Sequence, residues 1–333
     1  MEYYPLKFYE IYKPKIWGGR NIESLLGKHL PAGEDIGESW EVSDHFDDVS
    51  VIRNGPLEGL TLREVWREAP VEILGEELAE RGFTEFPLLV KFIDAQKVLS
   101  VQVHPDDEYA RTHDPSGESG KNEAWYVLAA GEDSKLTAGV KEGTTREDFL
   151  RLLDEEAVEK CLNPVDVSPG DLVHIAAGTV HAIGAGIVVC EIQQTSDATY
   201  RIWDWGRVGS DGKPRPLHVD HAVNVIDFER GPVGKTAPRE VRAETGRRWL
   251  LDECEFFVIE RLEFGERFTE AEPDDRFSIF VCIGGAGSLV SEGERWPYRL
   301  GDTVLVPACC PPVTFEPSEA TTMLKTFIPR DSA

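Results

Sequence analysis

The feature that most constrains this chain is a short motif that occurs twice. Gly170-Asp-Leu-Val-His-Ile-Ala-Ala177 resembles Gly301-Asp-Thr-Val-Leu-Val-Pro-Ala308, at an offset of 131 residues. Upstream, segments 126–131 and 281–286 can be aligned at an offset of about 155. In each copy of the motif a Gly-Asp turn leads into alternating apolar residues, the pattern of a strand that follows a tight turn. The repeat predicts two similar β units, compatible with jelly-roll barrels.

Two segments interrupt the strand pattern with helical signals. Residues 61–82 open with the capping box Thr61-Leu-Arg-Glu64, and Pro70 breaks the helix formers that follow. Residues 144–162 open with Thr144 and, three residues later, Glu147. We therefore expect a mostly β chain of two units with small helical insertions near 61–82 and 144–162. The first unit is predicted at 1–240 and the second at 241–333, with the connection around 222–247.

The net charge of the chain excludes some partners. Its 61 acidic and 35 basic residues give a charge of −26, which repels nucleic acid and anionic lipid. The longest uncharged apolar stretch, 277–290, is shorter than the roughly 18–20 residues that span a membrane. No secretory signal is visible, and the six cysteines lack metal-type spacing, so we expect reduced thiols and a cytoplasmic location. An anionic substrate would need a local basic pocket.

One predicted strand has an unusual polar face. In segment 98–105, Ser100, Gln102 and His104 share one face, whereas the opposite face is apolar. The apolar face is expected to pack into the core. The polar face is expected to line a cavity or to face solvent.

Four further segments supply polar groups of the same kind. They contribute Lys121, Glu123, His181, Glu191, Arg201 and Arg207. Two histidines, one glutamine and one glutamate form a mixed nitrogen and oxygen ligand set for a divalent metal, intermediate between those of Zn²⁺ and of harder ions. The arginines and the lysine would provide the positive pocket that a phosphate requires.

Several of these runs resemble those of type I mannose-6-phosphate isomerases. They are Ser-Val-Gln-Val-His-Pro-Asp-Asp at 100–107, Gly-Lys-Asn-Glu-Ala-Trp at 120–125, Ala-Gly-Thr-Val-His-Ala at 177–182 and Gln-Thr-Ser-Asp-Ala-Thr-Tyr-Arg at 194–201, with Trp-Gly-Gly at 17–19. The similarity extends from residue 11 to about 228 and is to the short bacterial form. It implies two cupin-type jelly-roll units and a metalloenzyme that interconverts mannose 6-phosphate and fructose 6-phosphate.

The resemblance also implies a role for each candidate residue. The ligands of one divalent ion, expected to be Zn²⁺, would be Gln102, His104, Glu123 and His181. The catalytic residues would be Lys121, Glu191 and Arg201, and the substrate phosphate would be bound by Ser100 and Arg207. In the second unit Pro312 stands where the repeat would place a counterpart of His181. We therefore expect no metal of this kind in the second unit.

Three questions stay open at the level of the sequence. The catalytic base could be Glu191 or Lys121, and Glu191 could instead be only an ion-pair partner of Arg201. A non-catalytic sugar-phosphate-binding cupin and a cupin metal oxygenase are the alternative functions. The expected partner is a small sugar phosphate, and the chain could be a monomer or a homodimer.

Overall fold

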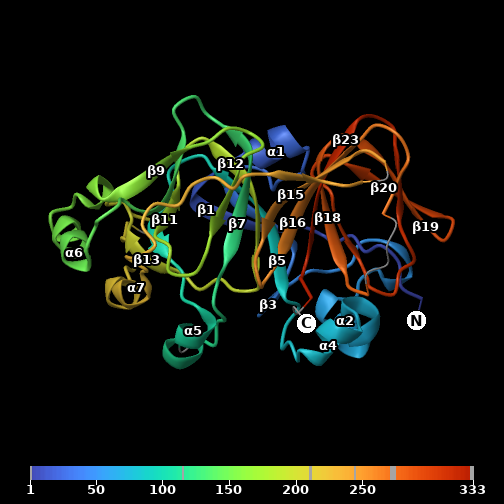
Figure 1. Cartoon of the computed structure of the whole chain (residues 1–333), viewed down its shortest axis with the longest axis horizontal. Helices are drawn as coiled ribbons and strands as arrows, with labels where there is room; N and C mark the ends of the chain where they lie inside the picture. Colours follow the sequence, from blue (N-terminus) through green and yellow to red (C-terminus); the bar gives the residue numbers. More distant parts are fainter. Residues whose placement is uncertain (1, 115, 210–211, 244, 271–274, 331–333) are drawn as a thin grey trace.

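The computed structural model describes residues 2–330 except 115, 210–211, 244 and 271–274, and it places four antiparallel sheets one after another along the long axis (Figure 1). The first sheet of the first unit has the strand order β1 (Ile11–Gly19), β2 (Ile36–Val42), β5 (Leu88–Ala95), β12 (Ile187–Gln194), β7 (Glu123–Ala130) and β10 (Leu172–Ile175). The second sheet of this unit has the strand order β13 (Tyr200–Trp203), β6 (Val101–Val103), β11 (His181–Ile183), β8 (Lys135–Val140) and β9 (Leu162–Asp166). In the second unit, the third sheet has the strand order β14 (Arg239–Val241), β15 (Arg247–Glu253), β16 (Val258–Phe264), β23 (Thr321–Phe327), β18 (Ser278–Gly284) and β21 (Thr303–Val306). The fourth sheet has the strand order β17 (Phe268–Thr269), β22 (Thr314–Pro317), β19 (Ala286–Ser291) and β20 (Glu294–Arg299). A small hairpin pairs β3 (Asp44–His45) with β4 (Asp48–Val49).

The helices are short and connect strands. They are α1 (Asn21–Leu26), α2 (Leu62–Glu68), α3 (Pro70–Leu74), α4 (Glu76–Glu80), α5 (Asp107–His113), α6 (Arg146–Asp154) and α7 (Val219–Val225), with 3₁₀ turns at Gly55–Leu57 and Val158–Lys160. Among the described residues, no helix has the length and apolar character that a membrane crossing requires.

The order of the strands gives a jelly-roll connectivity. From β5 to β13 the chain crosses repeatedly between the two sheets of the first unit, so consecutive segments face each other across the sandwich. The prediction of a mostly β chain built from jelly-roll units with helical insertions is confirmed.

Three apolar layers hold the four sheets together. The first lies inside the first unit, where Trp125 and Val189 of one sheet pack against Leu136 and Ile183 of the other. The second lies between the units, where residues on the outer face of the first sheet meet the third sheet. The third lies inside the second unit around Phe315. Polar side chains inside the first sandwich therefore need hydrogen-bonding or charged partners of their own.

The predicted repeat is visible in the strand register. Leu172 pairs with Tyr126, and Thr303 pairs with Val281 at the same two offsets. The turn glycines also match, because the Gly170 N–H binds the carbonyl of Val127 at 2.9 Å and the Gly301 N–H binds that of Cys282 at 2.8 Å. Equivalent residues of the two units therefore form equivalent strand pairs and turn hydrogen bonds.

This register also relates two buried charge pairs of opposite polarity. In the first unit Glu191 lies opposite Lys91, with the ammonium and carboxylate 3.1 Å apart. At the equivalent place in the second unit Lys325 lies opposite Glu260, with the charged atoms 3.9 Å apart. The basic and acidic members have exchanged strands.

The helical insertions agree with the sequence except at one cap. Thr61 and Glu64 form the predicted capping box of α2, and the helix ends before Pro70, which starts α3. The second insertion was predicted to start at Thr144, but its N-cap is Thr145, whose side chain accepts the backbone N–H of Asp148. Thr144 and Thr145 each have an acidic residue three positions later, so the sequence offers two equivalent caps, of which the structure uses Thr145.

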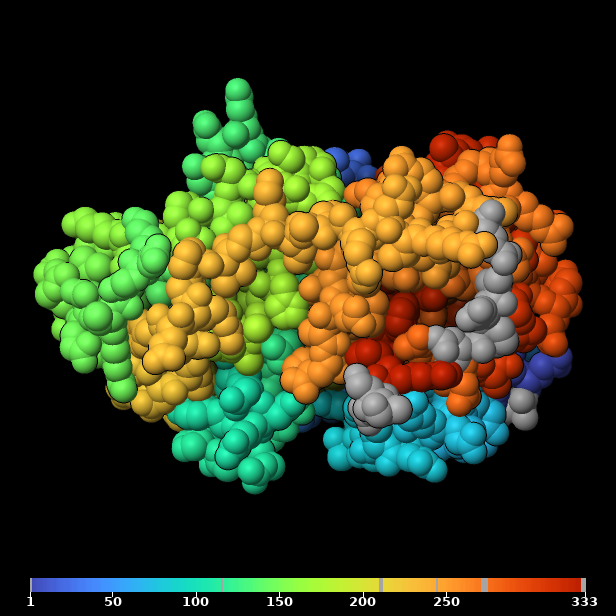
Figure 2. Space-filling model, in the orientation of Figure 1, coloured from blue at the N-terminus to red at the C-terminus, as the bar shows by residue number. Residues whose placement is uncertain are grey.

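The connection between the units lies on the surface. After α7 the chain runs along the first unit, where Val233 N–H binds Ala138 O and Thr236 N–H binds Leu172 O, before it enters β14 (Figure 2). The predicted boundary at 240/241 falls inside β14. Because β14 pairs with β15, we propose that the division between the units lies just before β14.

Candidate active site

Both sheets of the first unit contribute to a compact group of metal-binding side chains. Gln102 on β6 and His181 on β11 are Cα partners in the antiparallel ladder, and their amide nitrogen and Nε2 atoms are 3.2 Å apart. His104 follows β6, and Glu123 starts β7 in the facing sheet. The ligand atoms of His104, Glu123 and His181 all lie within 4.8 Å of one another. The structure thus brings the four predicted ligands together.

Backbone carbonyls orient the two imidazoles. His104 Nδ1 lies 2.6 Å from Ala198 O, and His181 Nδ1 lies 2.8 Å from Thr179 O. Because a carbonyl only accepts hydrogen bonds, each Nδ1 carries the proton and each Nε2 presents a lone pair. Histidines that bind metals are commonly fixed in this way through the other ring nitrogen.

This donor set fits a divalent metal ion. Among the described residues, His104 Nε2 and both Glu123 oxygens are buried and form no hydrogen bond of acceptable geometry. Burial, with the nearby Lys121 charge, lowers the pKa of His104 to about 4, and burial lowers that of His181. Burial alone would raise the pKa of Glu123, but Lys121 and His104 hold it well below its usual value. Two neutral imidazoles and one carboxylate are the protonation states that a metal requires.

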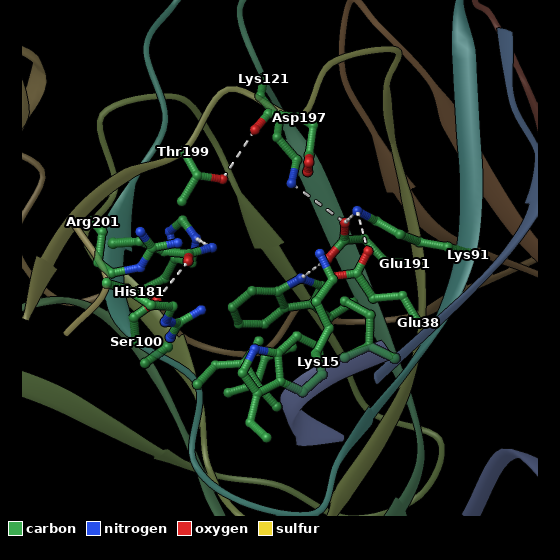
Figure 3. Close-up of a pocket in the computed structure, with 18 residues that line it drawn as sticks. Lys15, Glu38, Lys91, Ser100, Lys121, His181, Glu191, Asp197, Thr199 and Arg201 are labelled. Atoms are coloured by element: carbon green, nitrogen blue, oxygen red, sulfur yellow. Dashed lines mark hydrogen bonds and ion pairs between the residues drawn. The ribbon is translucent and has the colours of Figure 1, made fainter. Parts of the chain in front are cut away.

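A pocket of about 280 Å³ opens beside this group, and Figure 3 shows its polar lining. Ser100, His181 and Arg201 lie on one side, and Lys91, Glu191 and Glu38 lie on the other. The remaining polar lining residues include Lys15, Gln102, Lys121, Asp197, Thr199 and Arg215. Five lysines and arginines therefore face this space in a chain of charge −26, which provides the local basic pocket expected from the sequence.

Alternating charges cross one wall of the pocket. Lys15 lies 3.0 Å from Glu38, Glu38 lies 3.8 Å from Lys91, and Lys91 lies 3.1 Å from Glu191. Lys121 continues the series, at 3.5 Å from Glu191 and 2.8 Å from Glu123. Burial alone would lower the pKa of Lys121, but the surrounding carboxylates raise it. These contacts fix each charged group relative to the next, so the wall is preorganised.

The suggested pairing of Glu191 with Arg201 is wrong. Glu191 Oε1 is paired with Lys91 and Lys121, and Oε2 accepts the Trp125 Nε1–H at 2.9 Å. Arg201 lies across the pocket, where one guanidinium nitrogen donates to Pro216 O at 3.0 Å. Burial and the nearby Arg215 lower the pKa of Arg201. Each side of the pocket thus carries its own cations.

The two predicted phosphate-binding residues are placed differently. Ser100 lines the pocket, with its Oγ 3.2 Å from Gln102 Oε1. Arg207 is not among the lining residues in the described part of the chain, and its guanidinium binds Asp204 and the carbonyl of Val98. Arg215, which the sequence did not indicate, lines the pocket and binds the same Asp204 at 2.6 and 2.8 Å.

The sequence contains patterns that could have indicated three more pocket residues. Lys91 is the one charged residue in the apolar run 86–93, so it required a buried partner. Glu38 shares a period-two pattern with Trp40, which donates its Nε1–H to Glu38 at 2.7 Å. Asp197 lies inside the recognised run 194–201.

Comparisons with known proteins agree with this geometry. Residues 6–146 match the model of the phosphomannose isomerase type I catalytic domain. The chain is 36% identical over 305 residues to mannose-6-phosphate isomerase ManA of Bacillus subtilis, covering 91% of this chain and 93% of that protein. A probable mannose-6-phosphate isomerase of the same organism, GmuF, is 33% identical over 311 residues, covering 92% and 94%.

A solved structure is similar over almost the whole chain. The crystal structure of the mannose 6-phosphate isomerase from Bacillus subtilis superposes with a TM-score of 0.89 at 31% identity, covering 97% of this chain and 99% of that one. The similarity therefore includes the second unit as well as the unit that holds the pocket.

Proposed function

Because the chain belongs to the type I phosphomannose isomerase family, we propose that its pocket interconverts mannose 6-phosphate and fructose 6-phosphate. The reaction moves a proton between C1 and C2 through a cis-enediol, whose oxygens gain negative charge that fixed cations stabilise. The observation that carries the proposal is a buried cluster of metal-binding side chains at the edge of a cation-lined pocket.

One divalent ion would be held by Gln102, His104, Glu123 and His181. Their mixed nitrogen and oxygen donors favour Zn²⁺. When bound, the ion supplies Lewis acidity, which reduces the cost of negative charge on the sugar oxygens.

Proton transfer is assigned to Lys121 and Glu191, whose charged atoms are 3.5 Å apart. The Trp125 Nε1–H and Lys91 hold the Glu191 carboxylate at the pocket wall, where it can accept the proton from carbon. Arg201, on the opposite side, would stabilise the developing oxyanion. Ser100, which lines the pocket, and Arg207, which does not, would bind the phosphate, and Arg215 adds a pocket-lining cation that shares Asp204 with Arg207.

The proposal is tested by a coupled isomerase assay on mannose 6-phosphate before and after chelation. We expect turnover to be lost on chelation and restored by Zn²⁺, because the enediol charge is no longer stabilised in the metal-free protein. Absence of turnover in folded, metal-loaded protein would refute the isomerase and favour a binding module. Oxygen consumption measured with an electrode would instead indicate an oxygenase.

Substitution of the phosphate-binding arginine is expected to act on KM. Arg207→Ala should raise KM for mannose 6-phosphate about tenfold with little change in kcat, since a contact made equally in ground and transition states affects binding alone. The same assay on Arg215→Ala measures how much KM depends on the pocket-lining arginine, which also binds Asp204. Arg111→Ala, an exposed change on α5, is the matched control. An unchanged KM in Arg207→Ala would remove this residue from phosphate binding.

We further propose a reducing, cytoplasmic location and a monomeric or homodimeric state. The six cysteines all have free thiols, as the sequence predicted, and the proposed substrate is a phosphorylated metabolite.

A further inference from the structure

The loop between β12 and β13 supplies groups that no strand pairing holds in place. Asp197 and Thr199 of this loop line the pocket. Between them, the carbonyl of Ala198 accepts the Nδ1–H of His104 at 2.6 Å. The orientation of the His104 ring therefore depends on the position of one loop carbonyl, and so on whatever fixes the loop.

The partly buried carboxylate of Glu118 binds this loop, together with the Gln193 side-chain amide, which donates to the carbonyl of Ser196 at 2.6 Å. Its Oε2 accepts the backbone N–H of Asp197 at 3.0 Å and lies 3.2 Å from Ser196 Oγ. Ser196 Oγ donates to the carbonyl of Ser119 at 2.8 Å and accepts the Ala198 N–H at 3.2 Å. Residues 118–119, which precede β7, thus bind two consecutive loop residues, and the second hydrogen bond of Ser196 Oγ extends this anchoring to Ala198.

His45 neutralises Glu118 from the other side. Its Nε2 lies 2.9 and 3.1 Å from the two carboxylate oxygens, and the side chains are 9% and 11% exposed. Burial alone would lower the pKa of His45, but Glu118, with Asp197 and Glu85, raises it above its usual value. Burial alone would raise the pKa of Glu118, but His45 and the Asp197 N–H lower it. The two residues therefore form an ion pair whenever the His45 imidazole is protonated.

The same imidazole also contacts Trp40, a neighbour of the charged wall. The ring of His45 packs edge-on against Trp40, with ring centroids 5.7 Å apart. Trp40 Nε1–H donates to Glu38, which lines the pocket. His45 therefore contacts Glu118 directly and is linked to the charged wall through Trp40, although neither His45 nor Glu118 is among the described lining residues.

We propose that Glu118 and His45 are positioning residues for the isomerase, an inference that rests on the proposed function. They act through the Asp197 backbone and the Ala198 carbonyl, and so keep His104 turned toward its ligand partners. Loss of the pair lets the loop shift, which weakens metal binding and misplaces the groups around the reacting carbons. The proposed phosphate-binding groups Ser100, Arg207 and Arg215 bind Gln102 and Asp204 rather than Glu118 or His45, so we expect them to keep their positions.

The first test compares two substitutions at one position. Glu118→Ala removes the acceptor and the charge, and we expect a Zn²⁺ dissociation constant and a kcat each about tenfold worse, the effect of losing a group that orients a metal ligand. Glu118→Gln keeps an acceptor for the Asp197 N–H, so both effects should be smaller. KM should stay within about twofold, because the phosphate contacts are unchanged. Zinc competition with a chromophoric chelator gives the affinity without relying on turnover. Glu108→Gln, an exposed change on α5, is the control.

The second test uses pH. The His45 pKa is raised, so the pair contributes fully below the usual value of about 6.5 and is lost as pH rises through the folded value. Glu85, whose pKa burial raises to about 7, faces the same imidazole and ionises in the same range, which favours the imidazolium. We expect the wild-type kcat profile to contain an alkaline decline that His45→Gln lacks. His29→Gln, at an exposed histidine, should keep the wild-type profile.

Wild-type turnover separates the two hypotheses. An inactive, metal-loaded wild type would refute the isomerase itself. An active wild type whose Glu118→Ala and Glu118→Gln variants match Glu108→Gln in kcat and zinc affinity would refute the positioning role alone. If Glu118→Ala does not fold, Glu118→Gln and His45→Gln decide the question by the same measurements.

Discussion

Replacement of His104 by alanine is expected to abolish stoichiometric zinc binding and to lower kcat by at least about 1,000-fold. Lewis-acid stabilisation contributes several kcal/mol, and each 1.36 kcal/mol corresponds to a factor of ten in rate. His104 Nε2 is a buried ligand atom that lies within 4.8 Å of the ligand atoms of Glu123 and His181. Alanine has no atom that could bind the metal in its place. Metal content by elemental analysis and the coupled assay together check the result.

The control for this variant is His29→Ala, which changes an exposed histidine. It should retain wild-type metal content and turnover. Full activity in folded His104→Ala would contradict the metal assignment, whereas loss of turnover with metal retained would move His104 from metal binding to another role.

Replacement of Glu191 by glutamine is expected to lower kcat by about 100- to 1,000-fold with zinc retained, the range for loss of a general base. The amide has the same shape and can still accept the Trp125 Nε1–H, but it cannot take a proton from carbon. Steady-state kinetics and metal analysis measure the two quantities. Exchange of the C2 hydrogen of mannose 6-phosphate in D₂O, followed by NMR, isolates the proton-transfer step.

The companion variant Lys121→Met decides between the two candidate bases. If Glu191 is the base, Glu191→Gln should abolish C2 exchange, and Lys121→Met should slow turnover while exchange continues. The opposite result would assign the base to Lys121. Lys97→Met, at an exposed lysine outside the described pocket lining, provides the control for loss of a lysine charge.

The sequence predicted the parts of the site that local periodicity determines. Ser100, Gln102 and His104 share a face because strand side chains alternate, and the structure places the first two in the pocket lining and His104 in the metal-binding group beside it. The pairing of two units followed from one repeated turn, since a Gly-Asp turn fixes the start of the next strand and hence its register. Where two adjacent residues are of the same type, as at Thr144 and Thr145, the sequence left the position of the helix N-cap uncertain by one residue.

The contacts that depend on tertiary pairing could not be predicted in the same way. Glu191 meets Lys91 because β12 pairs with β5, strands that are about 100 residues apart in the chain. No local pattern excludes the alternative partner Arg201, which lies across the pocket. Arg215 comes from an irregular segment with no periodicity, and only its contact with Asp204 reveals its place. Sequence alone thus identified the donors more reliably than their partners.

The reversed charge pairs limit how the two halves of such a chain can diverge. Lys91 and Glu191 correspond by register to Glu260 and Lys325. Reversing one charge alone would set like charges together, and breaking a buried pair costs about 3–5 kcal/mol. If the halves descend from one duplicated ancestor, both members had to change together or pass through uncharged residues. The fold requires the partnership and tolerates either polarity, which leaves a duplicated half free to exchange a reactive carboxylate for an amine.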